Sequence, residues 1–302
     1  MTDSYYGQPI VRAPVWKHDI PAYLFTGGLA AGSALLAAGA DATGRPVLRR
    51  TGRLAALAAL GASAYFLVND LGRPERFHHM LRVAKPTSPM SMGTWILTAF
   101  GGAAGLAGAG ELLSGTGPRA VRRPARAAGR VGGAAAGAIA PALATYTAVL
   151  LADTAVPSWH EAHPELPFVF AGSALASGAG AGLIGAGLTP GGLREAGPAR
   201  RLATAGGALE LYGAHRVETR LGLLSEPYRT GRAGRLLRTG RALTAAGIAA
   251  AWLGRRSRVV TAASGVALLA ASLATRFGIF AGGVASANDP RYTVLPQRAR
   301  TR

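Results

Sequence analysis

The sequence predicts an all-α integral membrane protein with about eight transmembrane helices in two four-helix bundles. Of the 302 residues, 49% are hydrophobic and only 16% are charged, whereas soluble domains average about 25% charged residues. The apolar residues are gathered in stretches near the ~20 residues that cross a bilayer as a helix. Segments rich in arginine, proline and glycine separate these stretches. A disordered chain, which is poor in apolar residues, is excluded.

Eight apolar stretches follow one another along the chain. They run approximately over 21–40, 54–70, 91–113, 131–152, 167–188, 202–217, 239–254 and 259–285, and the seventh is short. A soluble alanine-rich helical protein accounts for any one stretch, but not for eight in succession with arginine clusters between them. We therefore expect a multi-pass protein of the cell membrane, with an even number of spans and both termini on one side.

The expected organisation has four parts. These are an N-terminal surface segment over 1–20, a first four-helix bundle over 21–152, a second over 153–285 and a C-terminal tail over 286–302. Glycines stand four residues apart in several spans, at Gly28/Gly32, Gly101/Gly105, Gly133/Gly137 and Gly178/Gly182. This spacing places each pair on one helix face and lets helix backbones approach closely. A genome rich in G and C, which favours alanine, glycine and arginine codons, explains any one pair equally well.

Polar and aromatic residues lead into the first span. Asp19 can cap the exposed amides of the helix, and Pro21 suits a first helical turn. Trp16 and Tyr23 lie at the depth where aromatic anchors collect. His18 next to Asp19 forms a pair able to exchange protons near neutral pH.

The second span ends in a polar segment that contains Asn69, Asp70 and Arg73. The apolar spacing over 75–83, which includes His78, predicts a short helix on the membrane surface. An ordinary loop helix fits this segment as well as the rim of a site or a partner contact does.

Other polar residues fall within or at the ends of the spans. Tyr146 lies inside the fourth, where its phenol needs a hydrogen-bond partner, either a ligand carbonyl or a neighbouring helix. Glu111 closes the third span. Glu210, His215 and Glu218 share a face of the sixth and suit a proton path, although the outer two can instead extend to the surface. We expect Glu210 to face the interior.

The sequence argues against several cofactors. The absence of cysteine excludes disulfides, a cysteine-ligated zinc site and an iron–sulfur cluster held by this chain alone. Among the six histidines only His215 approaches the interior of a span, so we expect no haem and no bound metal. The net charge of +19 lies in arginine clusters between apolar spans, which favours contacts with membrane lipids over nucleic acid.

Four ordered segments together resemble the NrfD/PsrC family, the membrane subunits of polysulfide-reductase-type complexes. They read DIPAYLFTGGLAAG at 19–32, NDLGRPERF at 69–77, KPTSPMSMGTW at 85–95 and YTAVLLA at 146–152, with Pro157 and Trp159 after the last. The resemblance covers the first half of the chain. Beyond about residue 190 it rests on hydropathy and on Glu210.

The resemblance implies an eight-helix, haem-free membrane subunit that oxidises or reduces a quinone of the menaquinone or ubiquinone type. Such a subunit docks an iron–sulfur protein of the four-cluster ferredoxin type, which is itself bound to a molybdopterin catalytic subunit. The quinone site lies in the first bundle, near the docking face. Tyr146 matches a family tyrosine that contacts the quinone. Tyr23 stands where relatives of the polysulfide reductase type carry a histidine, and His18 and Asp19 are the candidates to take that role.

The resemblance also assigns expected roles to the remaining candidates. Asn69, Asp70, Arg73 and His78 become partner-docking or proton-entry residues. The residues themselves fit this function, because a quinone head group needs hydrogen-bond donors for its carbonyl oxygens and groups that exchange protons. The alternative is a proton-coupled transporter or a purely structural membrane anchor, since acids within spans suit a carrier. Against a transporter, no inverted repeat is visible and the polar residues gather at one membrane edge.

Overall fold

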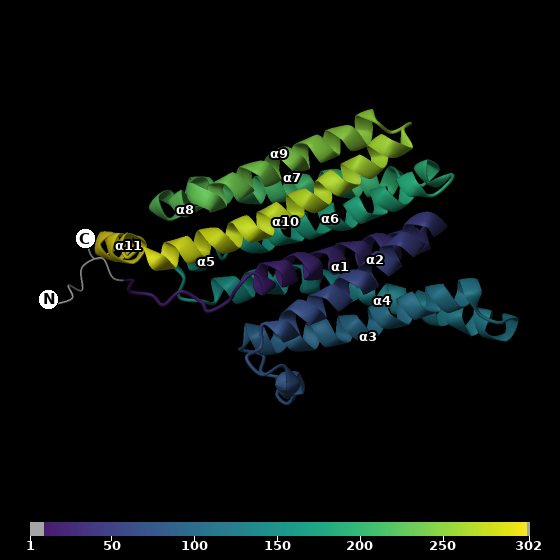
Figure 1. Cartoon of the computed structure of the whole chain (residues 1–302), viewed down its shortest axis with the longest axis horizontal. Helices are drawn as coiled ribbons and strands as arrows, with labels where there is room; N and C mark the ends of the chain where they lie inside the picture. The colour runs from purple at the N-terminus through teal and green to yellow at the C-terminus, as the bar shows by residue number, and fades with distance from the viewer. Residues whose placement is uncertain (1–8, 301–302) are drawn as a thin grey trace.

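Eight long helices lie side by side in the computed structural model, which describes residues 9–300 (Figure 1). They are α1 (Asp19–Ala42), α2 (Pro46–Asn69), α3 (Pro89–Thr116), α4 (Arg119–Ala152), α6 (Leu166–Leu188), α7 (Gly197–Arg220), α9 (Gly231–Leu253) and α10 (Arg258–Asn288). Each contains most or all of one apolar stretch, in the same order. The described part of the chain contains no strand.

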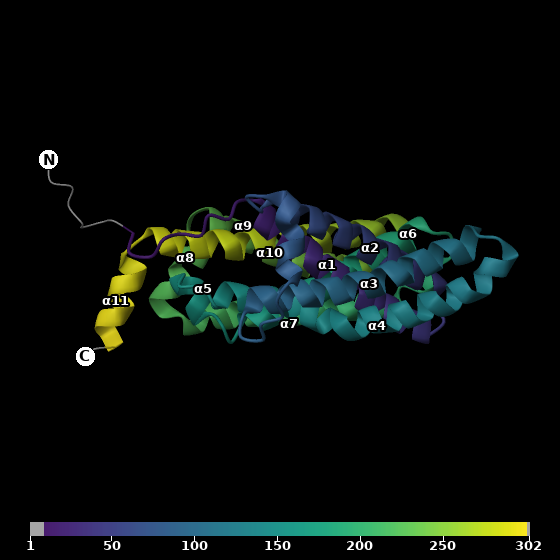
Figure 2. The same cartoon turned by 90° about the horizontal axis from the view of Figure 1, so that it is seen from below.

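In the described part of the chain, short elements connect the long helices, and one more follows the last of them. They are η1 (Pro74–Leu81), α5 (Pro157–Glu161), η2 (Gly192–Arg194), η3 (Gly222–Ser225), α8 (Glu226–Arg229) and α11 (Arg291–Arg300). In the two ribbon views α5, α8 and α11 lie at one end of the elongated molecule, which we call the proximal end (Figures 1 and 2). The connections α1–α2, α3–α4, α6–α7 and α9–α10 lie at the opposite, distal end. The expected surface helix over 75–83 is the 3₁₀ helix η1, none of whose residues is buried.

Local chemistry sets where several helices begin. Ser88 caps α3, since its side chain accepts a hydrogen bond from the backbone N–H of Ser91 at 3.4 Å. Glu195 supplies a cap from a distant part of the chain, because its Oε2 accepts from the N–H of Val47 at 2.8 Å at the start of α2. The expectation that Asp19 caps α1 is wrong. His18 occupies the cap position, and Asp19 is already helical, with its carboxylate directed to the end of α2.

Close backbone contacts join the helices. α1 packs against α2, α4 and α6, while α10 packs against α6 and α9, and α3 against α4. Gly32 of α1 and Gly178 of α6 face one another, and a Cβ on either would overlap the backbone of the other helix. Gly101 and Gly105 lack this role, since a Cβ on Gly105 would meet nothing within 4 Å. Small residues therefore set the spacing of some helix pairs and not of others.

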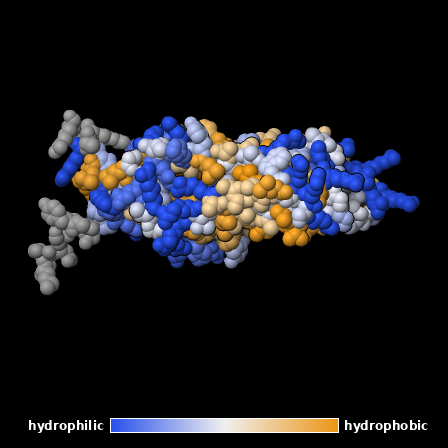
Figure 3. All heavy atoms as spheres, turned by 90° about the horizontal axis from the view of Figure 1, so that it is seen from above, coloured by the Kyte–Doolittle hydropathy of each residue, from blue (hydrophilic) through white to orange (hydrophobic). Residues whose placement is uncertain are grey.

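The surface divides into an apolar middle and two hydrophilic ends (Figure 3). Exposed apolar side chains include Leu106, Val149, Phe168, Val266 and Leu273. Six of the helices are long and apolar enough to cross a bilayer, namely α1, α2, α3, α4, α6 and α10. This arrangement is that of an all-α, multi-pass membrane protein.

Candidate functional site

A polar cluster lies at the proximal end, where α1 begins and α2 ends. Nδ2 of Asn69 donates a hydrogen bond to Oδ2 of Asp19 at 3.0 Å. On the other side of this carboxylate, Nε2 of His18 lies 3.6 Å from Oδ1, and the Asp19 side chain is 9% exposed against 78% for His18. Asp19 is thus a nearly buried carboxylate connected to solvent through an exposed histidine.

Asp70 extends this cluster beyond the end of α2. Its carboxylate accepts a hydrogen bond from the backbone N–H of Lys17. Partial burial raises the pKa of Asp70, the Lys17 hydrogen bond opposes that rise, and the nearby charge of Asp19 adds to it. The structure therefore brings His18, Asp19, Asn69 and Asp70 together, from segments about 50 residues apart in the sequence.

Tyr146 and Tyr23 face the apolar core between the helices, with exposed fractions of 8% and 5%. The ring of Tyr146 lies against Gly93 of α3, where an added Cβ would approach Cδ2 to 2.6 Å. The Tyr146 hydroxyl is buried and has no hydrogen-bond partner among the described residues. A buried hydroxyl without a partner is destabilising, so this group is available to an acceptor that is not part of the chain.

These residues occupy one layer of the first four long helices. Tyr23 is in the second turn of α1, Gly93 in the second turn of α3 and Tyr146 in the last two turns of α4. At 1.5 Å per residue, each lies within about 10 Å of the proximal end of its helix. Asp19 and Asn69 lie at that end itself. The layer combines a polar edge with two buried phenols a short distance inside it.

His18 also lines a second space at the proximal end. A cavity of about 580 Å³ lies between the start of α1 and the segment from α8 to α10. Its lining includes Lys17, Arg232, Phe277 and Phe280, but neither tyrosine of the buried layer. The structure therefore places His18 between the Asp19 cluster and this cavity.

Arg73 and His78 lie in the exposed connection from α2 to α3. Arg73 directly precedes η1, and Figure 1 shows this connection standing out from the side of the molecule, below the proximal end of α3. The side chain of Phe77 is about half exposed, and the ring of His78 lies edge-on to that of His79 at 4.4 Å. This protruding loop is accessible to a partner and adjoins the Asp19 cluster through Asp70.

Of the four candidates for a proton path, only Glu210 and Glu218 lie near each other. Glu111 lies at the distal end, paired with Arg49 and Arg53. Glu210 and Glu218 line one narrow space of about 20 Å³ between α7, α9 and α10, and Glu218 pairs with Arg241 at 2.5 Å. His215 is on the exposed face of α7.

Arg276 is a buried charge that the sequence reasoning missed. It lies in the middle of α10 with no exposed surface, and its Nη2 donates to the carbonyl of Phe170 at 2.8 Å. The guanidinium lies 3.8 Å above the Phe170 ring, while its Nε and Nη1 have no partner among the described residues. The charge of Glu210 acts on it across the helix interface. A single arginine within the apolar stretch 259–285 was the signal that could have identified it.

About the first two thirds of the chain match a known protein family. No curated protein matches the chain. The family model described as polysulphide reductase, NrfD, matches residues 8–205. This match is more than half of the chain, and it includes the Asp19 cluster, the η1 loop and the Tyr146 layer. The chain therefore belongs to the polysulphide reductase NrfD family.

Proposed function

We propose that the protein is the membrane anchor and quinone-reactive subunit of a molybdopterin oxidoreductase complex. It exchanges electrons between a partner iron–sulfur subunit of the four-cluster ferredoxin type and the quinone pool of the cell membrane. The observation that carries this proposal is the buried hydroxyl of Tyr146, which has no partner among the described residues. Membership of the NrfD family supports it.

The residues of the proximal layer fit a quinone head group, of the menaquinone or ubiquinone type. Tyr146 offers a hydrogen-bond donor to a carbonyl oxygen from within an apolar core. Tyr23 contributes a second phenol to the same core. Asp19 and His18 join this layer to the surface and can relay protons that the head group takes up or releases. The chain supplies binding and proton exchange, and the electrons come from the partner.

The partner is expected at the proximal end. The chain has no cysteine, so it has no ligands for an iron–sulfur cluster of its own. Arg73 is exposed and Asp70 is partly exposed beside the layer that holds Tyr146, and no residue of η1 is buried. Docking there places the cofactors of the partner on the same side as the proposed quinone site.

We also propose that all eight long helices cross the membrane, as two four-helix bundles. α7 packs along α6, and α9 packs along α10, and both α6 and α10 are apolar enough to span. The arginines of α9 gather in its first half, at Arg232, Arg235, Arg238 and Arg241. The remainder of α9 is apolar, so its charges fit one membrane edge.

The test is the Tyr146→Phe variant in the intact complex. We expect electron transfer to or from quinol to fall about 10- to 100-fold, which is what one lost hydrogen bond to a reacting group costs. Assembly and the activity of the catalytic subunit with an artificial electron carrier stay unchanged. Tyr212→Phe, an exposed tyrosine of α7, is the matched control. Full quinol activity in Tyr146→Phe removes the hydroxyl from the site.

A proton-coupled transporter is the second candidate, and the buried charges of Glu210 and Arg276 are the observation that favours it. The two functions separate in vesicles that contain the protein without redox partners. Proton-driven uptake of a solute under those conditions supports the transporter. Proton movement that requires the assembled complex and quinol supports the redox subunit.

A further inference from the structure

A cavity of about 380 Å³ lies at the distal end, between the start of α2, the end of α3 and the start of α4. Its charged lining consists of five arginines and two carboxylates, which leaves a net charge of +3. These residues are Arg49, Arg50, Arg53, Arg126, Arg130, Asp41 and Glu111. We call this space the distal arginine pocket. It lies at the end of the molecule opposite the proposed quinone site.

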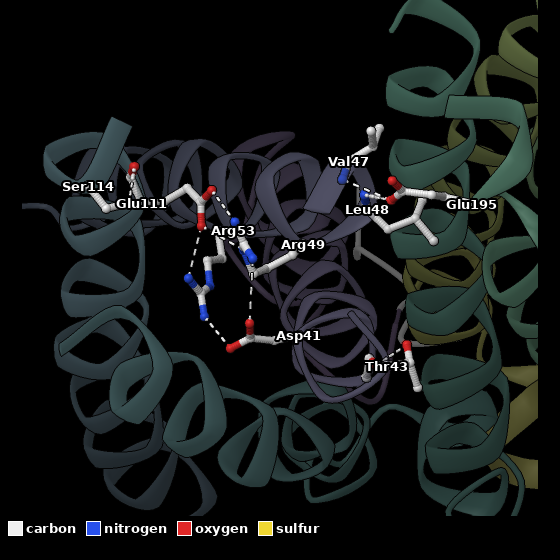
Figure 4. Close-up of polar contacts among 10 residues, drawn as sticks. Asp41, Thr43, Val47, Leu48, Arg49, Arg53, Glu111, Ser114 and Glu195 are labelled. Carbon is white, nitrogen blue, oxygen red and sulfur yellow. Dashed lines mark hydrogen bonds and ion pairs between the residues drawn. The ribbon is translucent and has the colours of Figure 1, made fainter. Parts of the chain in front are cut away.

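Both carboxylates are already bound by two of the arginines (Figure 4). Arg53 donates from Nη1 to Glu111 at 2.9 Å and from Nη2 to Asp41 at 2.8 Å. Arg49 donates from Nε and Nη2 to the two oxygens of Glu111, at 3.0 and 3.1 Å. Asp41 and Glu111 therefore neutralise Arg49 and Arg53, which form the inner wall of the pocket. They do not neutralise the other three arginines.

The outer arginines are Arg50, Arg126 and Arg130. Their side chains make no hydrogen bond or ion pair with any residue from 9 to 298, the part of the chain for which side chains are described. Arg126 and Arg130 are one turn apart on α4, so they point from the same helix face. Three like charges that converge without a counter-charge repel one another, and an anion between them relieves that repulsion.

The inner wall of the pocket is rigidly built. Arg53 is buried, and two glycines of α4 make room for it, since a Cβ on Gly133 would approach its Nη2 to 2.9 Å and one on Gly129 its Nη1 to 3.2 Å. The Nε of Arg53 is buried and has no partner among the described residues. This Nε lies toward Gly133, where an added Cβ would approach it to 3.3 Å, so the packing of α4 holds the arginine as well as its two carboxylates do.

We propose that the distal arginine pocket binds the phosphate of an anionic membrane lipid. Arginine suits this ligand because its planar guanidinium matches phosphate oxygens in bidentate geometry. A lipid is favoured over free phosphate because apolar side chains continue from the pocket toward the middle of the molecule. Leu112 lines the cavity, while Leu106 of α3 and Val131 of α4, which lie further toward the middle of the molecule, are 43% and 66% exposed. The phosphate then lies among the arginines and the acyl chains lie along α3 and α4.

Lipid retention by the purified full-length protein tests this proposal. The probes are dioleoyl phosphatidylglycerol and dioleoyl phosphatidylcholine, added to delipidated protein in detergent and counted by native mass spectrometry. We expect the native chain to prefer phosphatidylglycerol, and Arg126→Gln/Arg130→Gln to bind it about tenfold more weakly or worse. Phosphatidylcholine binding stays unchanged.

The matched control is Arg119→Gln/Arg123→Gln, which removes the same charge from α4 with the same spacing but outside the pocket. An equal loss in both double variants assigns binding to diffuse surface charge and overturns the proposal. Inorganic phosphate provides the third arm. If it displaces phosphatidylglycerol at comparable concentration, the pocket is a free-anion site and the lipid assignment is wrong. Arg50→Gln, measured in the same way, gives an independent result from α2.

Discussion

Arg276 is the residue whose burial and charge conflict most strongly. We predict that the double variant Arg276→Met/Glu210→Leu keeps the melting temperature in detergent the same or raises it, because replacing both charges of a buried, incompletely paired arginine and glutamate by apolar side chains is often neutral or stabilising by about 1–4 kcal/mol. If the charge is functional, quinol turnover falls about tenfold in the same variant. A large drop in melting temperature with normal turnover per folded molecule would instead make Arg276 a structural residue, held by Phe170.

Arg73 is the residue that we expect to matter for assembly. Arg73→Ala removes an exposed cation from the loop beside the Asp19 cluster, and we predict about tenfold weaker retention of the iron–sulfur subunit during purification from membranes. The loss shrinks at high salt, as for other exposed interface charges. Arg235→Ala is the control, because Arg235 is exposed on α9 in the second half of the chain. Equal retention in both variants would move the docking surface away from η1.

The contact of α1 with α6 shows how elements are held together in this molecule. Gly178→Ala places a methyl group against the backbone of Gly32 and Ser33, and backbone cannot move aside as a side chain can. We predict destabilisation of about 1–3 kcal/mol, measured as a lower melting temperature in detergent. Gly105→Ala in α3 is the control and is neutral or slightly stabilising, since nothing lies within 4 Å of the new methyl and alanine favours helix.

The same glycines show how far the contacts between helices could be predicted from the sequence. The apolar stretches predicted the order and approximate bounds of the long helices, because length and hydropathy are local properties. The four-residue spacing of the glycines predicted which face of α1 carries small residues, but it did not predict that α6 packs against that face. The distal arginine pocket could not be predicted from the sequence for a related reason. Asp41, Arg53 and Glu111 come from three helices, and each alone resembles a charge at a span end.

The proximal site was partly predictable. His18 and Asp19 are neighbours in the sequence, and the family segments joined them to Asn69 and Tyr146. The burial of the Tyr146 hydroxyl without a partner was not predictable, because it depends on Gly93 of α3 lying against the ring. The separation of Glu111 from Glu210 likewise requires the course of each helix, which puts Glu111 near the distal end of α3 and Glu210 near the middle of α7.

At the scale of the whole molecule, the helix directions give the two ends different chemistry. The proximal end carries the polar cluster around Asp19, whereas the distal end carries the arginine pocket. The apolar band lies between them (Figure 3). The connection between α7 and α9 contains Leu223. If both helices cross the apolar band, this connection lies on the proximal side of the membrane, and if neither crosses, it lies on the distal side. Two arrangements of the second half are therefore distinguishable by the side of the membrane on which Leu223 is found.

Single cysteines test this topology, because the native chain has none and every label reports one position. We predict that Leu223→Cys in η3 reacts with a membrane-impermeant maleimide from the face that labels Thr87→Cys, between η1 and α3. Arg194→Cys in η2 and Arg256→Cys between α9 and α10 react from the opposite face. With only six crossing helices, the whole segment from 189 to 257 would lie on the distal face. Labelling of Leu223→Cys together with Arg194→Cys would therefore contradict eight spans, and the two controls fix the orientation of the vesicles in either case.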